Sequence, residues 1–290
     1  MSDDPRRRDA GRAGRSPGRG SPPTSRGGTP PPRQPSGRPR GPRAGDREGS
    51  APRPAEPPLP DEVTGRELDR SVHQQLRTLT KENAEGVARH LVMVAALLEA
   101  DDLDTAMAHA ATAVRRAGRV PAAREALGLV AYRQGDYARA LAEFRTVRRL
   151  SGSSHLLPLM ADCERGLGRH ARALELAASP EARSLSEAEK VELAIVVSGV
   201  RRDLGQDDAA LLALEMPQLR RGPRAGMHRL HYAYADALLH LGRTDEAREW
   251  LLRAVEGDTD NETDAVERLE ELDGVRLTDL TPPGDEEVQA

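Results

Sequence analysis

The chain has 290 residues, a formal net charge of −4 and only 2% aromatic residues. Its core therefore has to be built mostly from Leu, Ala and Val, and abundant Ala and Leu favour helices over strands. The longest apolar runs, residues 91–98 and 193–197, are far too short to cross a bilayer. No apolar stretch follows the arginines at positions 6–8, so we expect no signal peptide, no membrane contact and a cytoplasmic protein.

The segment 1–60 differs in composition from the rest of the chain. It contains 13 Arg, 6 acidic residues, 15 Pro and 10 Gly, which gives it a net charge of 13 − 6 = +7. A segment with so few large aliphatic side chains cannot offset its ordering entropy, which predicts a disordered tail. Its Arg-Gly pairs favour a weak contact with RNA or an acidic surface, although it lacks aromatic residues for stacking on bases. Because the whole chain contains only Lys81 and Lys190 as lysines, a GC-rich coding sequence also explains part of this basicity.

Helical periodicity begins at about residue 61. Apolar residues at Leu68, Val72 and Leu76 predict a leading helix over residues 61–80. Five helix pairs are predicted to follow, at about residues 85–118, 121–152, 154–183, 187–220 and 227–258. A capping helix at 261–272, apolar on one face and acidic on the other, is expected to close the helical domain 61–272. Residues 273–290 are predicted to form a disordered acidic tail.

The five helix pairs share two small residues in the same register. A packing alanine recurs at intervals of 33 to 37 residues, at Ala106, Ala140, Ala173, Ala210 and Ala247. Four of the pairs have a glycine at the turn between their helices, at Gly135, Gly168, Gly205 and Gly242, and Asp101 takes this place in the first pair. The two longer intervals place loops at residues 179–186 and 217–226. A repeated unit of this length predicts a stack of helix pairs.

The second pair carries the clearest motif, with Leu127, Gly128, Ala140 and Phe144 in the order L-G, then A-x-x-x-F. These residues resemble the tetratricopeptide repeat, as do the weaker units over residues 85–258. The second pair departs from the family pattern at Arg124, Ala131 and Gly152, where that pattern favours Trp, Tyr and Pro. The resemblance is to bacterial members with about five degenerate repeats, and it implies an all-α, right-handed superhelix (α-solenoid).

The resemblance also implies that the first helix of each pair lines a concave groove. Family groove positions fall on eight candidate partner-binding residues, with Leu98 and Asp203 at further groove positions. The eight are Tyr132, Arg133, Asp162, Arg165, Arg202, Arg229, Tyr232 and Asp236. Arg can grip a partner carboxylate with two hydrogen bonds, and Tyr offers apolar area with a polar end. Solvated surface charge is the alternative explanation for the same residues.

The sequence offers little for catalysis. It has no Walker A loop, no H-E-x-x-H and no paired C-x-x-C, and its one G-x-S-x-G string, residues 14–18, lies in the predicted tail. His228, His231, His240 and Asp236 could be weighed as metal ligands, but partly exposed groove or surface histidines explain them better. Cys163 is expected to be a buried small residue rather than a nucleophile. We therefore expect no enzyme, cofactor, metal or small-molecule substrate.

Two functions remain open from the sequence. The first is a non-catalytic scaffold or adaptor that binds a peptide or helix of an unidentified protein partner in the groove. The alternative is association with RNA through the basic tail, which predicts a steep loss of affinity with added salt.

Overall fold

The computed structural model describes residues 55–220 and 226–274, which all belong to one compact unit. Within these two ranges the regular structure is entirely helical, so the all-α prediction is confirmed. The helices in chain order are α1 (Arg70–Leu76), α2 (Lys81–Glu99), α3 (Leu103–Ala117), α4 (Pro121–Arg133), α5 (Tyr137–Ser151), α6 (Leu157–Gly166), α7 (His170–Ala177), α8 (Glu187–Asp203), α9 (Asp207–Leu214), α10 (His228–His240), α11 (Thr244–Gly257) and α12 (Ala265–Leu272). Apart from residues 55–60 and 273–274, the two predicted tails lie outside the described residues.

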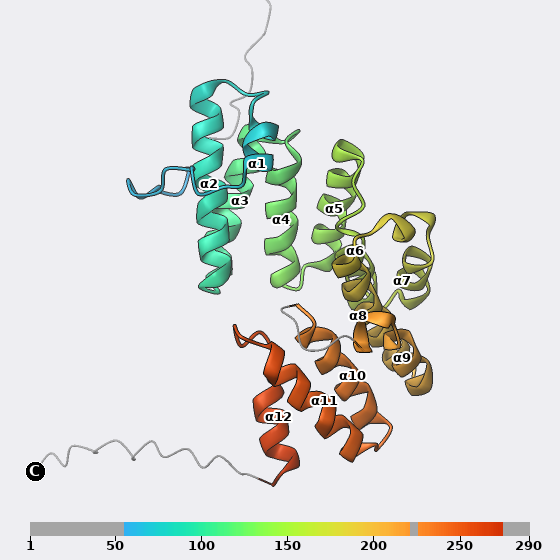
Figure 1. Ribbon diagram of the computed structural model, residues 1–290. Coiled ribbons are helices and arrows are strands. Elements are labelled where there is room, and N and C mark those ends of the chain that lie inside the picture. Colours follow the sequence, from blue (N-terminus) through green and yellow to red (C-terminus); the bar gives the residue numbers. More distant parts are fainter. Residues whose placement is uncertain (1–54, 221–225, 275–290) are drawn as a thin grey trace, which may run out of the picture. The chain divides into compact units, whose positions relative to one another are not determined.

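Helices α2 to α11 form five consecutive pairs, and each pair packs against the next along the chain (Figure 1). First helices of neighbouring pairs also touch, as α2 does with α4, α6 with α8 and α8 with α10. Short 3-10 helices, η1 (Pro180–Ser184) and η2 (Pro217–Arg220), occupy the two longer connections that the repeat intervals predicted. None of the helices in the described ranges is long and apolar enough to span a membrane.

The turn between the helices of each pair depends on a left-handed backbone conformation. The turn glycines of the second to fifth pairs have φ between 68° and 75°, and Asp101 in the first pair has φ 56°. Glycine adopts this conformation without a Cβ penalty, which explains its recurrence at this position. Asp102 and Asp136 then cap α3 and α5, each carboxylate accepting a backbone N–H bond at 3.1 Å.

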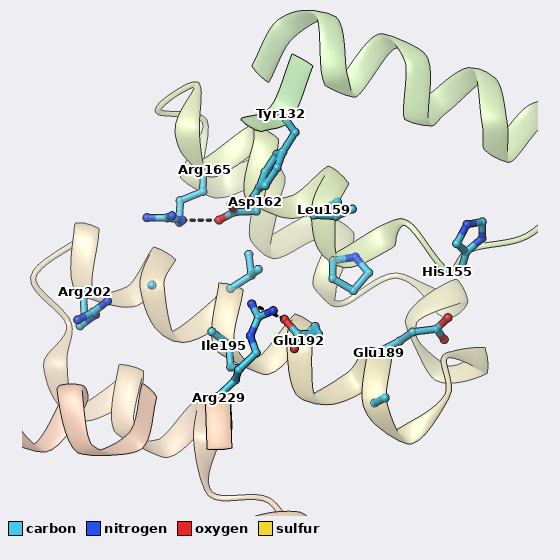
Figure 2. A pocket seen from close by; sticks show the side chains of 14 residues that line it. Tyr132, His155, Leu159, Asp162, Arg165, Glu189, Glu192, Ile195, Arg202 and Arg229 are labelled. Atoms are coloured by element: carbon cyan, nitrogen blue, oxygen red, sulfur yellow. Dashed lines mark hydrogen bonds and ion pairs between the residues drawn. The ribbon is translucent and has the colours of Figure 1, made fainter. Parts of the chain in front are cut away.

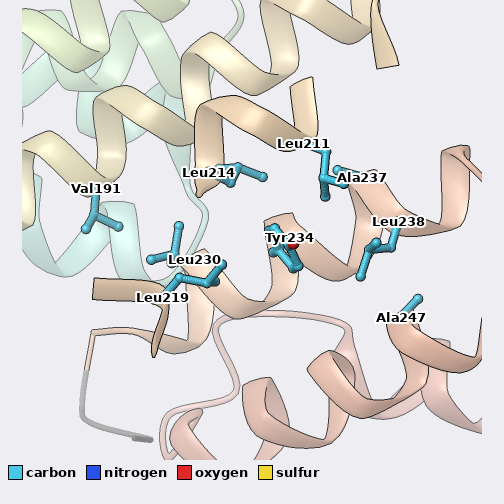
Figure 3. Close-up of a cluster of buried hydrophobic side chains, with 9 residues drawn as sticks. All are labelled: Val191, Leu211, Leu214, Leu219, Leu230, Tyr234, Ala237, Leu238 and Ala247. Carbon is cyan, nitrogen blue, oxygen red and sulfur yellow. The ribbon is translucent and has the colours of Figure 1, made fainter. Parts of the chain in front are cut away.

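The recurring alanines lie where two helices approach each other closely. All five are at most 1% exposed. The aliphatic core around them is divided into clusters that connect neighbouring pairs rather than one central core. The cluster in Figure 3 joins α8, α9, η2, α10 and α11 through Val191, Leu211, Leu214, Leu219, Leu230, Tyr234, Ala237, Leu238 and Ala247. A single pair cannot bury its apolar face alone, so stability depends on stacking.

Both end helices are shorter than predicted. In the stretch 61–80 only Arg70–Leu76 is helical, because Gly65, at φ 81°, packs the preceding chain directly onto α2. A Cβ at Gly65 would lie only 2.8 Å from the Ala88 Cβ. At the other end α12 begins at Ala265 rather than 261, since the Asp258 carboxylate accepts bonds from the backbone of Glu262 and Thr263 and holds a turn there.

Candidate functional site

A groove of about 620 Å³ opens across α4, α6, α8 and the first turn of α10 (Figure 2). On α8 its lining follows helical periodicity, since Glu192, Ile195, Gly199 and Arg202 lie three or four residues apart and so share one face. The lining of α6 and the chain just before it has the same spacing, with His155, Leu159 and Asp162 among its members. The groove is therefore built from the first helices of neighbouring pairs.

The groove changes character along these helices. Its middle is apolar, with buried Pro158 and the half-buried side chains of Leu159, Ile195 and Val196. Figure 2 shows Leu159 and Ile195 between Arg165 and Arg202, at the left of the view, and Glu189 with His155, at the right, while Arg229 lies in the middle beside Ile195. One end of the groove is thus lined by arginine and aspartate, and the other by glutamate and histidine.

At the arginine end, a chain of polar contacts links three successive pairs. The Tyr132 hydroxyl donates to Asp162 at 2.5 Å, and the Arg165 Nε donates to the same carboxylate at 2.7 Å. Arg165 Nη1 also donates to Asp203 on α8 at 3.2 Å. Burial, followed by the bond to Asp162, raises the pKa of the Tyr132 hydroxyl above its ordinary value. The phenol therefore stays protonated as a donor.

Three further contacts join α10 to α8 and to α12. Arg202 is paired with Asp236, whose second oxygen accepts from Arg268 Nη1 at 3.2 Å. Arg229 pairs with Glu192 at 3.0 Å nearer the glutamate end. These arginines are therefore already occupied by carboxylates of the same chain.

The candidate residues predicted from the sequence divide into two groups. Five of them line the groove: Tyr132, Asp162, Arg165, Arg202 and Arg229.

The other three lie outside the groove lining. Arg133 forms an exposed pair with Asp101 at 2.8 Å, and Asp236 is the partner of Arg202. The Tyr232 ring lies 6.0 Å from the Arg268 guanidinium. Of the two additional positions, Leu98 packs in the core with Val94, and Asp203 pairs with Arg165.

The apolar floor and the glutamate end of the groove were not predicted from the sequence. His155, Leu159, Glu189, Glu192 and Ile195 line the groove and were not predicted. The spacing of residues 188, 192, 195, 199 and 202 on one predicted helix was a usable signal for most of the α8 face.

The glutamate end has a negative electrostatic environment. A hydrogen bond from His155 to Glu125, at 3.2 Å, is the main cause that raises the pKa of His155, and the charge of Glu189 adds to it. Burial raises the pKa of Glu192, which Arg229 opposes and the nearby carboxylate of Glu262 reinforces. Negative charge is therefore in excess at this end.

The histidines weighed as metal ligands do not converge. His228 bonds to Glu262 at 2.9 Å, His231 stacks near Trp250 with ring centroids 5.5 Å apart, and His240 contacts its own helix at the Asp236 carbonyl. His228 and His231 are 7% and 1% exposed, so the expectation of partly exposed side chains is wrong for these two. Over residues 55–220 and 226–274, no group of three or more potential ligands could hold a metal ion.

Cys163 is fully buried, as expected, among apolar side chains that include Phe144 and Met160. Burial, and then the charge of Asp162, raises the pKa of its thiol to about 12. A thiol with such a pKa is a poor nucleophile at neutral pH.

Comparisons with known proteins concern the helical repeats. The family model described as tetratricopeptide repeat matches residues 91–155 and 202–262. A thermophilic tetratricopeptide-repeat protein from Thermus thermophilus is similar in structure, at 20% identity and a TM-score of 0.52, covering 64% of this chain and 98% of that chain. PilF of Pseudomonas aeruginosa is 15% identical with a TM-score of 0.45, covering 68% of this chain and 88% of its own.

A third solved structure is the tetratricopeptide-repeat protein YrrB, which has an unusual peptide-binding site. It is 18% identical with a TM-score of 0.38, and the match covers 67% of this chain and 96% of that chain. No curated protein matches the sequence.

Proposed function

We propose that this chain, whose residues 91–155 and 202–262 match the tetratricopeptide-repeat family model, is a non-catalytic scaffold that binds a segment of a partner protein in the groove between α4, α6 and α8. The observation that carries this proposal is the apolar floor of the groove. Leu159, Ile195 and Val196 leave apolar surface open to solvent in a hollow of about 620 Å³, rimmed by charged side chains. An apolar surface with a polar rim is typical of a protein interface.

The polar contacts along the groove support a scaffold rather than an enzyme. Arg165, Arg202 and Arg229 each pair with a carboxylate from a neighbouring helix pair, so they hold successive pairs together. A catalytic site instead needs titratable groups that converge around a place for a reacting atom.

Affinity capture from an extract of the source cells tests the proposal. Wild-type protein is compared with Ile195→Asp, which places a charge on the groove floor, and with Leu212→Asp. Leu212 lies on α9, outside the groove, and is 66% exposed, so the second variant carries the same kind of change elsewhere. We expect Ile195→Asp to lose the partner and Leu212→Asp to keep it, and equal recovery by both would contradict the proposal.

Deleting the basic tail separates this function from RNA association. The deletion should stop at residue 53, because Glu56 bonds to Arg116 at 2.9 and 2.5 Å and belongs to the helical domain. We expect the shortened protein to keep its protein partner. Loss of both the partner and bound RNA on deletion would favour the tail as the functional part.

A further inference from the structure

We propose that the groove selects a partner segment with a Lys or Arg beside an aliphatic residue, the cation lying between Glu189 and Glu192 and the aliphatic side chain on Leu159 and Ile195. This inference rests on the binding role proposed above and names the chemistry of the partner.

The glutamate end of the groove has room for one more positive charge. Glu125, Glu189 and Glu192 face two basic groups there, His155 at 3.2 Å from Glu125 and Arg229 at 3.0 Å from Glu192. Within residues 55–220 and 226–274, Glu189 pairs with no basic side chain, and its Oε2 accepts only the Ser186 backbone N–H, at 2.7 Å. A carboxylate on a groove wall without a counter-ion attracts a cation from a partner.

The pKa values of two groups at this end also respond to the neighbouring carboxylates. The pKa of His155 is raised chiefly by its bond to Glu125, and the pKa of Glu192 is raised by burial and by Glu262. A bound cation would favour the ionised form of Glu192 and so offset its desolvation and the repulsion from Glu262.

Within the described chain, the arginine end of the groove does not offer an unpaired positive charge for an acidic partner side chain. Arg165 is held between Asp162 and Asp203, and Arg202 is held by Asp236. The positive charges of both arginines are therefore already balanced by aspartates of the same chain, although Arg202 Nε keeps a free N–H among the described residues. This balance of charge favours a basic partner segment over an acidic one.

Spacing on α8 determines how the two partner side chains are related. Glu192 and Ile195 are three residues apart on one helix face, which separates their Cβ atoms by about 5–6 Å. A partner meets both positions with side chains at i and i+3 or i+4 of a helix, or at i and i+2 of an extended chain.

Selection of a displayed library of random short peptides on the full-length protein tests this inference. We expect the enriched peptides to carry Lys or Arg beside Leu, Ile or Val at these spacings. Enrichment of acidic or uncharged peptides, or of no binding peptide, would overturn it.

An enriched peptide is then measured against charge variants. Glu189→Gln with Glu192→Gln removes both charges, while Gln at position 189 keeps the capping box with Ser186. Glu249→Gln with Glu267→Gln, on the exposed surfaces of α11 and α12, is the matched control. We expect the groove pair to weaken binding by about tenfold or more, with a smaller dependence on salt, and the control to bind like wild type.

The outcomes distinguish this inference from the function on which it rests. If Ile195→Asp abolishes peptide binding but the Glu189→Gln/Glu192→Gln protein binds like wild type, the groove is the site and the proposed selection for charge is wrong. If neither change alters binding, both proposals fail. Thermal unfolding of each variant by circular dichroism checks that it is folded.

Discussion

At the level of single residues, the fold depends on the turn residues that adopt the left-handed backbone conformation. Gly135 has φ 75°, and no atom lies within 4 Å of the position that a Cβ would take, so only backbone strain opposes a side chain there. We expect Gly135→Ala to lower the free energy of unfolding by about 1 kcal/mol, since a non-glycine residue costs about 1–2 kcal/mol in this conformation. Gly135→Asn should cost less, because Asn tolerates it. Urea denaturation measures both, and equal costs for the two would contradict this explanation.

A buried histidine pair between α2 and α3 links stability to pH. His90 and His109 are at most 1% exposed, and their Nδ1 atoms lie 2.9 Å apart, so one ring donates and the other accepts while both are neutral. Burial, and then His109, lowers the pKa of His90 to about 4. Burial also lowers the pKa of His109. Glu56, 3.9 Å from His90, opposes the shift, and Arg116 adds to it.

The sign of the pH effect follows from these lowered values. Below the ordinary histidine pKa, about 6.5, the folded state binds fewer protons than the unfolded state. The pair therefore contributes fully to the free energy of unfolding above that pH, and this contribution is lost as the pH falls towards 4. Between pH 7 and pH 5 we expect the wild type to lose about 2 kcal/mol more stability than the His90→Leu/His109→Leu double variant. Denaturation curves at both pH values measure this, and parallel losses in the two proteins would exclude the pair as the cause.

At the scale of the helices, the pairs are linked by side chains that reach from one repeat to the next. Asp236 on α10 accepts from Arg202 on α8 and from Arg268 on α12, and its side chain is 12% exposed. We expect Asp236→Asn to cost about 1–3 kcal/mol, because the partly buried Arg202 loses its counter-ion and Arg268 keeps only Asp264 in the described part of the chain. Asp273→Asn removes the exposed pair with Arg248 and should cost less than about 1 kcal/mol. Similar losses for both variants in urea denaturation would show that Asp236 does not join the repeats in this way.

The helices and their turns could be predicted from the sequence because close helix packing and left-handed turns each favour one residue type. Alanine recurs where helices cross closely, and glycine recurs where φ is positive, so both appear in phase along the chain. The ends of the helical domain could not be predicted as well. The start of α1 depends on Gly65 meeting α2, and the start of α12 depends on a turn held by Asp258, which are contacts rather than periodicities.

The candidate site was predictable in position but not in chemistry. Family groove positions led to Arg165, Arg202 and Arg229, which do line the groove. Only the pairing of Arg165 with Asp162, three residues earlier on α6, follows a local spacing. The other carboxylate partners belong to other helices, up to 38 residues away for Arg165 and Asp203, so no local pattern indicates those pairings. From the sequence, the arginines could be read as contacts for a partner carboxylate or as solvated surface charge, whereas the balance of charge in the folded chain favours a basic partner segment.

Considered as a whole, the molecule presents its groove on the first helices and its packing alanines on the second helices. Each pair contributes only part of the groove, which takes residues from α4, α6, α8 and α10. A ligand in the groove contacts several pairs at once, so binding should also stabilise the stack against unfolding.

Photo-cross-linking shows whether a partner protein binds on the groove floor. A photoreactive amino acid is placed at Val196 on the groove floor or at Leu212 on the exposed side of α9, and the full-length protein is irradiated with its captured partner. We predict a cross-link to the partner from position 196 and none from position 212. Cross-linking from position 212 alone would contradict binding on the groove floor and would show that the binding surface lies outside the groove.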